Sequence, residues 1–244
     1  MNIALIGYGK MGKMIEPIAI ARGHEITLKI DVDNLEDFTP AKLKHVDVAI
    51  EFTKPETAFA NIVRCIEYNI PVVSGSTGWY EHLKEAESIC RQRNATMLCA
   101  SNFSIGVNVL FEINRQLARL MNSFPDYSVN IEETHHTQKL DAPSGTAITL
   151  AEGVIGELAR INNWKLHDNN SSCCRTVDSL LPILAIRRDS VPGTHIVKYS
   201  SEIDDIEIIH TAHNRKGFAL GAVLAAEYIH DKKGVFSMRD LLDI

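Results

Sequence analysis

The chain has 244 residues, of which 45% are hydrophobic and 23% charged, an ordinary composition for a globular protein of one large or two modest domains. Its net charge of −6 argues against a nucleic-acid scaffold, because phosphate binding requires a clear basic excess, and its apolar runs are too short to cross a membrane. The five cysteines form no CxxC pair, so we expect reduced thiols in a cytoplasmic protein and neither a zinc site nor a disulfide framework.

The first hundred residues alternate between strand and helix patterns, and the N-terminus resembles a strand more than a targeting segment. The expected strands are Asn2–Ile6, a strand carrying Ile26, Leu28 and Ile30, then Val46–Phe52, Pro71–Ser74 and Ala95–Cys99. The expected helices are Lys10–Arg22, Glu56–Glu67 and Tyr80–Arg93. Strands that alternate with helices in this way predict a parallel, doubly wound α/β sheet of the Rossmann type.

The pattern changes after residue 103. The expected helices are Asn108–Met121 and Ala147–Leu158, and the expected strands are Tyr127–Glu133, Leu180–Ala185, Thr194–Ser200 and Ile206–Ala212. The polar run Asn162–Ser172 is expected to be a flexible loop. A last helix at Gly217–His230 is rich in glycine and alanine, which favours close packing back onto the first domain. We therefore predict a dinucleotide-binding domain of residues 1–103 plus 214–244, and a central α+β substrate domain of residues 104–213.

A glycine-rich loop directly follows the first strand and opens the first helix. Gly7, Gly9 and Gly12 form a GxGxxG motif, in which the glycines permit a tight turn, close approach of a pyrophosphate and close helix packing. The free N–H groups at the helix start favour an anion. Asp31 lies nineteen residues after Gly12, where a carboxylate can accept hydrogen bonds from ribose hydroxyls. The motif predicts a nicotinamide dinucleotide site.

Two further loops follow the fourth and fifth strands. Gly75–Gly78 has the sequence GSTG, and Ala100–Phe103 has the sequence ASNF. The carboxyl ends of parallel strands meet at one edge of a sheet, where open α/β sheets bind ligands. Each loop alone could be an ordinary surface turn, but their shared placement favours a role at the cofactor site.

The segment Glu132–Ala147 carries the most specific chemistry. Two adjacent histidines and Lys139 precede Ser144, Gly145 and Thr146, which open an apolar helix. Such a helix start offers backbone and hydroxyl donors to a carboxylate, and a lysine adds positive charge. A histidine can give or take a proton near neutral pH. These groups suit an anionic substrate that must be protonated.

A metal site is the other hypothesis for His135 and His136, with His210 and His213 as further ligands. Adjacent residues on a strand point to opposite faces, and so do residues three apart. Neither pair is therefore arranged to chelate a zinc ion, and packing within a strand is the simpler explanation for His210 and His213.

The order of these motifs resembles that of the dihydrodipicolinate reductases. The resemblance lies in GYGKMG, GSTG, ASNFSIGVN and HHTQKLDAPSGTA, runs from Asn2 to about Ala147, and resumes at Val191–His195 and in the C-terminal helix. It implies reduction of 4-hydroxy-tetrahydrodipicolinate, or of the dihydrodipicolinate formed by its dehydration, to tetrahydrodipicolinate in lysine and diaminopimelate biosynthesis. It also implies NADH or NADPH as cofactor, a small dicarboxylate as substrate, and a homotetramer joined through the central domain.

The resemblance assigns roles to individual residues. It implies His135 as the catalytic proton donor and acceptor, and Lys139 as a second proton donor. The implied substrate-binding residues are His136, Ser144, Gly145 and Thr146. The implied cofactor contacts are Gly7, Tyr8, Gly9, Lys10, Met11, Gly12, Asp31, Gly75, Ser76, Thr77, Ala100, Ser101, Asn102 and Phe103.

The chain departs from the family pattern in two places. Ser172–Ala185 is reworked, and Val32 follows Asp31 where some members have an arginine that can hold a 2′-phosphate. We therefore expect NADH to be used at least as well as NADPH, although Lys10, Lys13 or Lys29 could offset the repulsion of that phosphate by Asp31.

Two other functions remain open at this point. A different two-domain Rossmann oxidoreductase, acting on an amino acid or a sugar, would explain the glycine loop but not the His-His-x-x-Lys segment. A redox sensor that binds NADH and regulates a partner would need a DNA-binding or docking module, and the sequence shows no basic recognition helix and no spare domain.

Overall fold

A computed structural model describes residues 1–167 and 179–244. The chain divides into two compact units: unit 1 comprises Met1–Ile105 and Lys216–Ile244, and unit 2 comprises Gly106–Arg215. No helix in the described part of the chain has the length and apolar character needed to span a membrane. Each unit has a sheet of its own.

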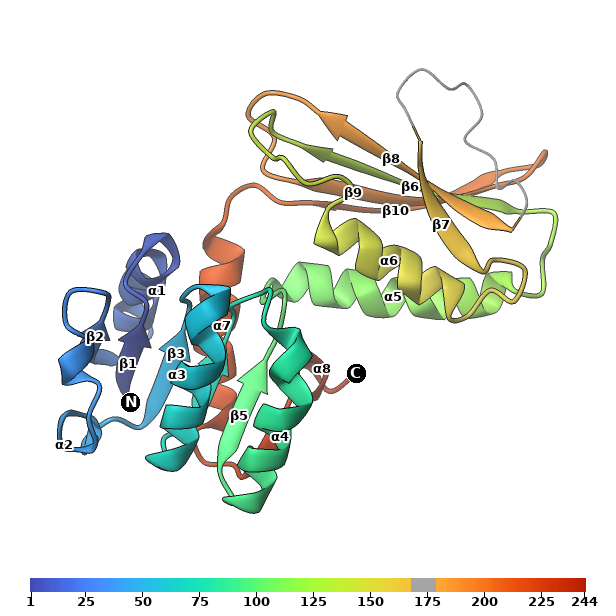
Figure 1. Ribbon diagram of the computed structural model, residues 1–244. Helices are drawn as coiled ribbons and strands as arrows, with labels where there is room; N and C mark the ends of the chain where they lie inside the picture. The colour runs from blue at the N-terminus through green and yellow to red at the C-terminus, as the bar shows by residue number, and fades with distance from the viewer. Residues whose placement is uncertain (168–178) are drawn as a thin grey trace. The chain divides into compact units, whose positions relative to one another are not determined.

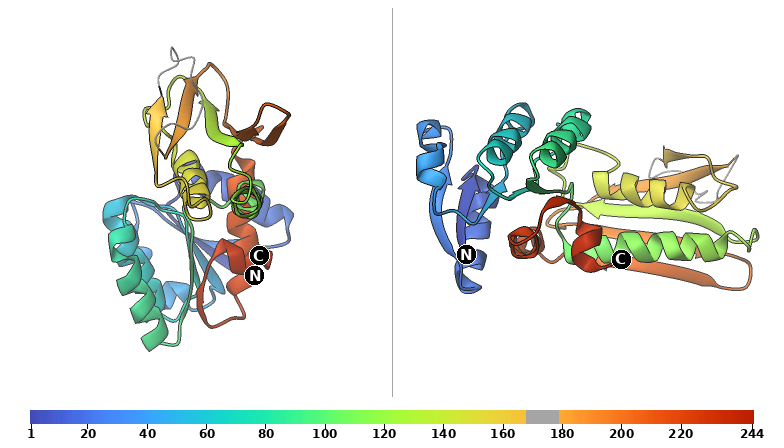
Figure 2. Two further views of the ribbon diagram at one scale, coloured as in Figure 1. Left: turned by 90° about the vertical axis from the view of Figure 1, so that its right-hand side faces the viewer. Right: turned by 90° about the horizontal axis from the view of Figure 1, so that it is seen from below.

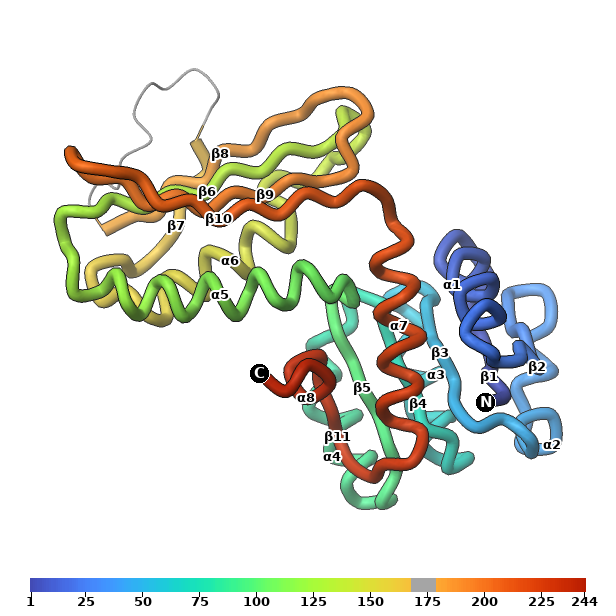
Figure 3. Tube along the Cα trace, turned by 180° about the vertical axis from the view of Figure 1, so that it is seen from behind, coloured from blue at the N-terminus to red at the C-terminus, as the bar shows by residue number. Residues whose placement is uncertain are grey.

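Unit 1 contains a six-stranded sheet in the order β11-β5-β4-β3-β1-β2, with every neighbouring pair parallel (Figures 1 and 3). The strands are β1 (Asn2–Ile6), β2 (Glu25–Ile30), β3 (Val48–Glu51), β4 (Val72–Ser74), β5 (Thr96–Cys99) and β11 (Gly234–Phe236). The central strands are buried on both faces, as expected when helices cover both sides of a parallel sheet. The Rossmann-type fold predicted from the alternating pattern is confirmed.

Helices cover both faces of this sheet (Figure 3). One face packs against α3 (Pro55–Glu67) and α4 (Leu83–Gln92), and the other against α1 (Lys10–Ala21) and α7 (Lys216–Ile229). The shorter helices of the unit are α2 (Pro40–Leu43) and α8 (Met238–Leu242), with 3-10 turns at Leu35–Asp37 and Tyr80–His82. Helix α7 is rich in small residues because it packs very closely: a Cβ at Gly221 would lie 1.7 Å from the carbonyl oxygen of Phe103.

Unit 2 contains a five-stranded mixed sheet in the order β10-β9-β6-β8-β7. The strands are β6 (Ser128–His135), β7 (Asn163–His167), β8 (Leu180–Arg187), β9 (Thr194–Ser200) and β10 (Asp205–Thr211). Helices α5 (Ile105–Met121) and α6 (Gly145–Ile155) lie against one face of this sheet (Figure 2). Alternate residues of β6, from Val129 to His135, point into the buried side, so the strand's period of two decides which side chains enter the interior.

The prediction of a flexible loop at Asn162–Ser172 is wrong for its first part. Asn163–His167 forms the edge strand β7, which pairs in parallel with β8. An edge strand can carry polar residues because only part of its surface is buried, so its composition resembles that of a loop. The rest of the predicted loop, from residue 168, lies outside the described residues. Residues 172–178, the first part of the segment Ser172–Ala185, also lie outside the described residues, whereas Leu180–Ala185 lies in β8.

Candidate active site

The glycine loop has the geometry that a dinucleotide requires. Gly7 has φ +90°, and a Cβ there would lie 2.1 Å from the carbonyl oxygen of Phe52; at Gly12 it would lie 2.5 Å from the carbonyl oxygen of Gly7. Around Gly9, by contrast, a Cβ would meet no atom within 4 Å. Helix α1 begins at the next residue without a side-chain cap, so its first N–H groups can bind a phosphate. These residues fit a bound dinucleotide.

The other predicted cofactor loops lie at the same edge of the sheet. Gly75–Thr77 follows β4 and Ala100–Phe103 follows β5, and both strands run parallel to β1. Of the predicted cofactor residues, Gly7, Gly12, Ser76 and Phe103 are buried, Tyr8, Met11, Asp31, Gly75, Ala100 and Asn102 are half-buried, and Gly9, Lys10, Thr77 and Ser101 are exposed. The parallel sheet therefore brings the three predicted loops to one edge.

The lysines near Asp31 differ in whether their charge is free to pair with a phosphate. The Asp31 side chain accepts a hydrogen bond from the Val32 N–H at 2.9 Å. Lys29 Nζ lies 2.6 Å from Glu16 Oε1, and it donates to the Tyr8 hydroxyl at 3.3 Å. Because Lys29 is paired with Glu16, its charge is largely neutralised. Lys10 is exposed inside the glycine loop.

Glu51 is a buried carboxylate at the end of β3 that the sequence analysis missed. It has no exposed surface. Its Oε1 accepts hydrogen bonds from the Thr53 N–H at 2.9 Å and the Ser76 hydroxyl at 2.8 Å, and its Oε2 accepts one from the Ser74 hydroxyl at 2.5 Å. Glu51 thus ties the loop after β3 to the GSTG loop. A glutamate ending the apolar run Val48–Ile50 is the signal that could have identified it.

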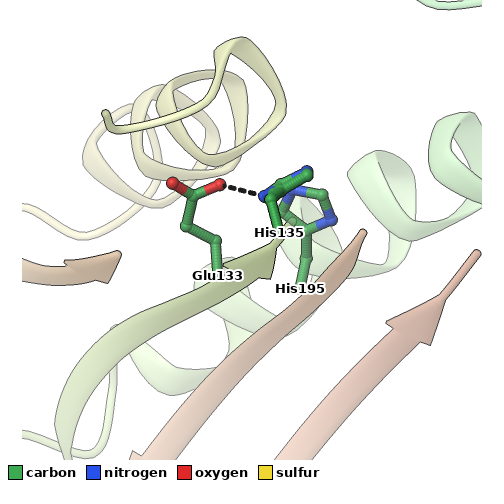
Figure 4. A group of neighbouring side chains, drawn as sticks. All are labelled: Glu133, His135 and His195. Carbon is green, nitrogen blue, oxygen red and sulfur yellow. Dashed lines mark ion pairs between the residues drawn. The ribbon is translucent and has the colours of Figure 1, made fainter. Parts of the chain in front are cut away.

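In unit 2, two strands bring a glutamate and two histidines together (Figure 4). Glu133 and His135 lie two apart on β6 and therefore point to the same side, and His195 enters from β9. His135 Nδ1 lies 2.8 Å from Glu133 Oε2, and the rings of His135 and His195 are 5.1 Å apart at an interplanar angle of 72°. Exposed fractions are 0% for Glu133, 8% for His135 and 4% for His195. These three side chains form a buried acid–base group.

The Glu133 carboxylate is held ionised by its neighbours. Its Oε1 accepts hydrogen bonds from the Ser144 N–H at 3.1 Å and from Arg187 Nη2 at 3.0 Å. Burial alone would raise the pKa of Glu133, but the interactions with His135, Ser144 and Arg187 together outweigh it and lower the pKa to about 2. The carboxylate is therefore negative at neutral pH.

His195 is a neutral partner in this group. Its Nε2 lies 3.2 Å from Ser144 Oγ. Burial, and then the proximity of His135, lower the pKa of His195 to about 4. The Ser144 hydroxyl also accepts a hydrogen bond from the Ala147 N–H at 3.2 Å as the N-cap of α6. Ser144 thus connects the start of α6 to both His195 and Glu133.

Lys139 lies in the loop between β6 and α6. Its Nζ lies 2.7 Å from Asp141 Oδ2 and 2.8 Å from Oδ1, and this contact lowers the pKa of Asp141. Arg187 Nε donates to the carbonyl oxygen of Lys139 at 3.2 Å, and Arg187 Nη2 donates to that of Asp141 at 2.6 Å. The side chain of Arg187 therefore links the Lys139 loop to Glu133.

The remaining predicted substrate residues lie on either side of this loop. His136 lines an open depression of about 720 Å³ together with residues that include Asp189, Val191 and His213. At the start of α6, Gly145 is exposed and has no atom within 4 Å of a built Cβ, and Thr146 is half-buried. The helix start is therefore accessible to a ligand.

Within the described ranges, Glu133, His135 and His195 form the group with the composition and spacing of a metal site. It is not one of the histidine pairs considered from the sequence. Glu133 Oε2 and His135 Nδ1 are separated by 2.8 Å, a hydrogen-bond distance that leaves no room for an ion between them. Arg187 already neutralises the carboxylate. The arrangement therefore suits proton transfer better than metal binding.

Three of these residues were missed by reasoning from the sequence. Glu133 precedes His135 by two positions on an expected strand, and this period-two spacing could have identified it. His195 ends the VPGTH motif, which carried part of the resemblance. Arg187 gave no local signal, because its partner Glu133 lies 54 residues away in the chain.

Comparisons with known proteins agree over almost the whole chain. Residues 1–103 match the family described as "Dihydrodipicolinate reductase, N-terminus", and residues 106–242 match "Dihydrodipicolinate reductase, C-terminus". The 4-hydroxy-tetrahydrodipicolinate reductase of Christiangramia forsetii is 50% identical over 99% of this chain and 98% of its own. That of Neisseria meningitidis serogroup B is 31% identical over 94% of this chain and 84% of its own. Neither relative bears the name of an amino-acid dehydrogenase, a sugar dehydrogenase or a sensor.

The fold is shared with solved structures as well. Dipicolinate-bound dihydrodipicolinate reductase from Paenisporosarcina sp. TG-14 superposes with a TM-score of 0.78, at 23% identity and 97% coverage of both chains. The amine dehydrogenase of Mycobacterium smegmatis gives a TM-score of 0.55 at 10% identity, covering 97% of this chain and 94% of its own, which reflects the Rossmann-type architecture alone. A nicotinamide cofactor follows from the family and its fold. The chain belongs to the dihydrodipicolinate reductase family and is an oxidoreductase.

Proposed function

We propose that the enzyme reduces 4-hydroxy-tetrahydrodipicolinate, or the dihydrodipicolinate formed by its dehydration, to tetrahydrodipicolinate in lysine and diaminopimelate biosynthesis. The observation that carries this proposal is the buried pair of His135 with ionised Glu133, joined through Arg187 to the loop that bears Lys139. A protonatable group beside a lysine and an open helix start suits an anionic substrate that must gain a proton. The identity of 50% with the Christiangramia forsetii reductase supports the same substrate.

We assign the cofactor to the glycine loop of unit 1. When bound, a reduced nicotinamide supplies the hydride. Gly9 and the uncapped start of α1 offer backbone N–H groups to the pyrophosphate, and Asp31 offers its carboxylate to the adenosine ribose. The remaining contacts are assigned to Gly75–Thr77 and Ala100–Phe103, at the same edge of the sheet.

The substrate's carboxylates are assigned to the region between β6 and α6. Lys139 offers positive charge, and Gly145 and Thr146 offer the N–H groups of the first turn of α6. Ser144 contributes at the same helix start, and His136 contributes from the rim of the neighbouring depression. A small dicarboxylate is consistent with the dipicolinate bound in the Paenisporosarcina relative.

Proton transfer is assigned to His135 and Lys139. Hydride addition leaves electron density toward the ring nitrogen of the substrate, which must then gain a proton. His135, supported by the Glu133 carboxylate, holds and exchanges that proton, and Lys139 is a second donor. Neutral His195 lies beside them without adding a competing charge.

Three finer points belong to the same proposal. NADH is used at least as well as NADPH, because Asp31 repels a 2′-phosphate and Lys29 is already paired with Glu16.

The active form is a homotetramer joined through the sheet of unit 2. The face of that sheet away from α5 and α6 carries apolar residues such as Ile209, which is 55% exposed. The free thiols of the described cysteines, Cys65, Cys90 and Cys99, suit the reducing cytoplasm.

The direct test is oxidation of NADH, followed by its absorbance, in the presence of freshly generated dihydrodipicolinate. We expect turnover that depends on both compounds, and little or none with a panel of amino acids and sugars. Equal or faster turnover with a member of that panel would overturn the assignment. Size determination in solution, by light scattering, tests the tetramer separately.

A further inference from the structure

The carboxylate of Glu133 is fully buried and fixed by three donors. Ser144 N–H and Arg187 Nη2 bind its Oε1, while Oε2 faces His135 Nδ1 at 2.8 Å. We propose that Glu133 is a positioning residue that sets the tautomer and orientation of the His135 imidazole, and that Arg187 holds Glu133 in place. This inference rests on the proton-transfer role of His135 in the proposed function.

The tautomer follows from the chemistry of the contact. An ionised carboxylate can only accept hydrogen bonds, so the nitrogen facing Oε2 must carry a proton. Neither Glu133 Oε2 nor His135 Nδ1 has another hydrogen-bonding partner among the described residues. Because Oε1 is held from two sides, the carboxylate cannot rotate away. Neutral His135 is therefore protonated at Nδ1, and its lone pair is at Nε2, available to exchange a proton with the substrate.

Gly193 keeps the Nε2 side of the ring open. A Cβ built at Gly193 would lie 3.0 Å from His135 Nε2 and 3.3 Å from its Cδ2. A side chain would therefore press against the nitrogen that bears the lone pair. Gly193, just before β9, leaves Nε2 open, and the Glu133 carboxylate occupies Nδ1. Nε2 is therefore the one nitrogen of His135 that can react.

Arg187 extends this control to the second proposed proton donor. Besides Glu133, its guanidinium binds the carbonyl oxygens of Lys139, Asp141 and Ile186, at 3.2, 2.6 and 2.9 Å. A guanidinium has a planar fork of donors that can satisfy several acceptors at once, which a lysine ammonium on a flexible stem cannot reproduce. Arg187 thus fixes the Glu133–His135 pair relative to the loop that carries Lys139.

The tautomer can be measured by 15N NMR of the imidazole nitrogens in protein labelled at histidine. The chain has ten histidines, and the spectrum of His135→Gln identifies the signals of His135 by their loss. We expect a protonated Nδ1 and an unprotonated Nε2 in the unmodified enzyme at neutral pH. Protonation at Nε2 instead would overturn the proposal.

Glu133→Gln should reverse this tautomer. Ser144 N–H and Arg187 will hold the single amide oxygen, which turns the NH2 group toward His135 Nδ1. The ring must then present a lone pair at Nδ1 and carry its proton at Nε2. We expect the 15N spectrum to show the proton at Nε2 in place of Nδ1. We also expect kcat to fall roughly 10²- to 10⁴-fold, the usual loss of rate when a general acid–base residue is in the wrong tautomer. The KM for substrate and the Kd for NADH should change less than about threefold, since substrate and cofactor bind through other residues.

Glu132→Gln is the matched control. Glu132 is the adjacent residue on β6 and points to the opposite face of the sheet, so its substitution should leave both the tautomer and kcat unchanged. A loss of kcat in Glu133→Gln without a switch of tautomer would show a merely structural role and overturn the proposal.

A double variant separates positioning from general damage. If Glu133 acts through His135, Glu133→Gln combined with His135→Gln should turn over no more slowly than His135→Gln alone. Additive losses would contradict this. Should Glu133→Gln fail to fold, Arg187→Lys carries the same test: it should loosen the carboxylate, introduce part of the Nε2-protonated form and lower kcat, and an unchanged tautomer would overturn the role of Arg187. If His135→Gln keeps full turnover, the proposed function of His135 fails, whereas the NMR result still reports on Glu133.

Discussion

The ammonium group of Lys139 lies within 2.8 Å of both carboxylate oxygens of Asp141, two residues further along the same loop. The Asp141 side chain is 62% exposed and that of Lys139 is 21% exposed, so water can take over from the lysine at the carboxylate. Ion pairs with an exposed partner are typically worth about 0–1 kcal/mol. Lys139 can therefore exchange Asp141 for a substrate carboxylate at small cost, while Arg187 keeps the loop backbone in place.

Lys139→Ala should reduce activity far more than cofactor affinity. Loss of a charge-assisted contact to a carboxylate costs roughly 1.5–3 kcal/mol, and loss of a proton donor adds to this. Steady-state kinetics and the Kd for NADH by fluorescence titration provide the measurement. Asp141→Asn is the control, because it removes the partner and leaves Lys139 free; it should keep or slightly lower the KM for substrate. Near-normal turnover of Lys139→Ala would exclude the assignment.

The adjacent histidines should respond differently to the same substitution. His135→Gln should leave a folded protein that binds NADH but turns over about 10²-fold or more slowly, the usual scale for a general acid. His136→Gln should mainly raise the KM for substrate, because His136 lies at the depression and outside the Glu133 pair. Kinetics on the two variants decide this; an exchange of the two behaviours would mean that the roles are reversed.

The ratio of kcat/KM for NADH and NADPH at low salt tests the role of Asp31. We expect a ratio of one or more in favour of NADH, and Asp31→Ala should shift it toward NADPH by removing both the ribose contact and the repulsion of the 2′-phosphate. Lys29 is paired with Glu16, which leaves Lys10 as the more available cation. If the unmodified enzyme prefers NADPH, Lys10→Ala should abolish that preference, and failure to do so would rule out this lysine.

Buried His195 should make folding stability depend on pH below neutrality. Its pKa is about 4 in the folded protein against an ordinary 6.5, so the unfolded chain takes up a proton first as the pH falls. Above pH 6.5 His195 therefore does not reduce the free energy of unfolding, and between pH 6.5 and pH 4 that free energy falls progressively. By pH 5 the loss of unfolding free energy is about 2 kcal/mol, at 1.4 kcal/mol per pKa unit.

Urea unfolding at pH 7 and pH 5 measures this effect. His195→Gln removes the titrating group and should show a smaller difference between the two pH values than the unmodified protein. Glu133, with a pKa of about 2, adds its own loss only at lower pH, below the ordinary value of 4.5 for a glutamate. An identical pH dependence in the variant would contradict the assignment to His195.

Glu51→Ala should weaken both unit 1 and cofactor binding. Without the carboxylate, the buried Ser74 hydroxyl loses its acceptor, which costs roughly 1–3 kcal/mol, and the contacts that tie Thr53 and Ser76 to β3 are lost. We expect a lower free energy of unfolding and a higher Kd for NADH, measured by urea titration and fluorescence. Glu56→Ala, at an exposed position in α3, should change neither quantity.

Local patterns in the sequence predict much of this molecule. The alternation of strand and helix and the glycine loop at Gly7–Gly12 are enough to predict the Rossmann-type sheet. Short or polar elements were not predictable: β7 has the composition of a loop, and β11 has only three residues. Both depend on pairing with a strand that is distant or weakly marked in the sequence.

The site divides in the same way. The His-His-x-x-Lys segment and the start of α6 are contiguous, so the sequence indicates them directly. The contact of Arg187 with Glu133 depends on the parallel register of β6 with β8, in which His135 pairs with Arg187. No local periodicity specifies that register, and therefore no pattern in the sequence reveals the arginine.

The two-segment construction of unit 1 has a consequence for synthesis. The ribosome makes β1 to β5 first, then all of residues 106–215, and only afterwards α7 and β11. Until then the face of the sheet that α7 covers, with Ile3, Leu5 and Val48, lacks part of its apolar cover. Unit 2 is contiguous and can complete its core as soon as it emerges. The domain that is begun first is therefore finished last, and translation that stops before residue 216 would release a half-covered sheet prone to aggregation.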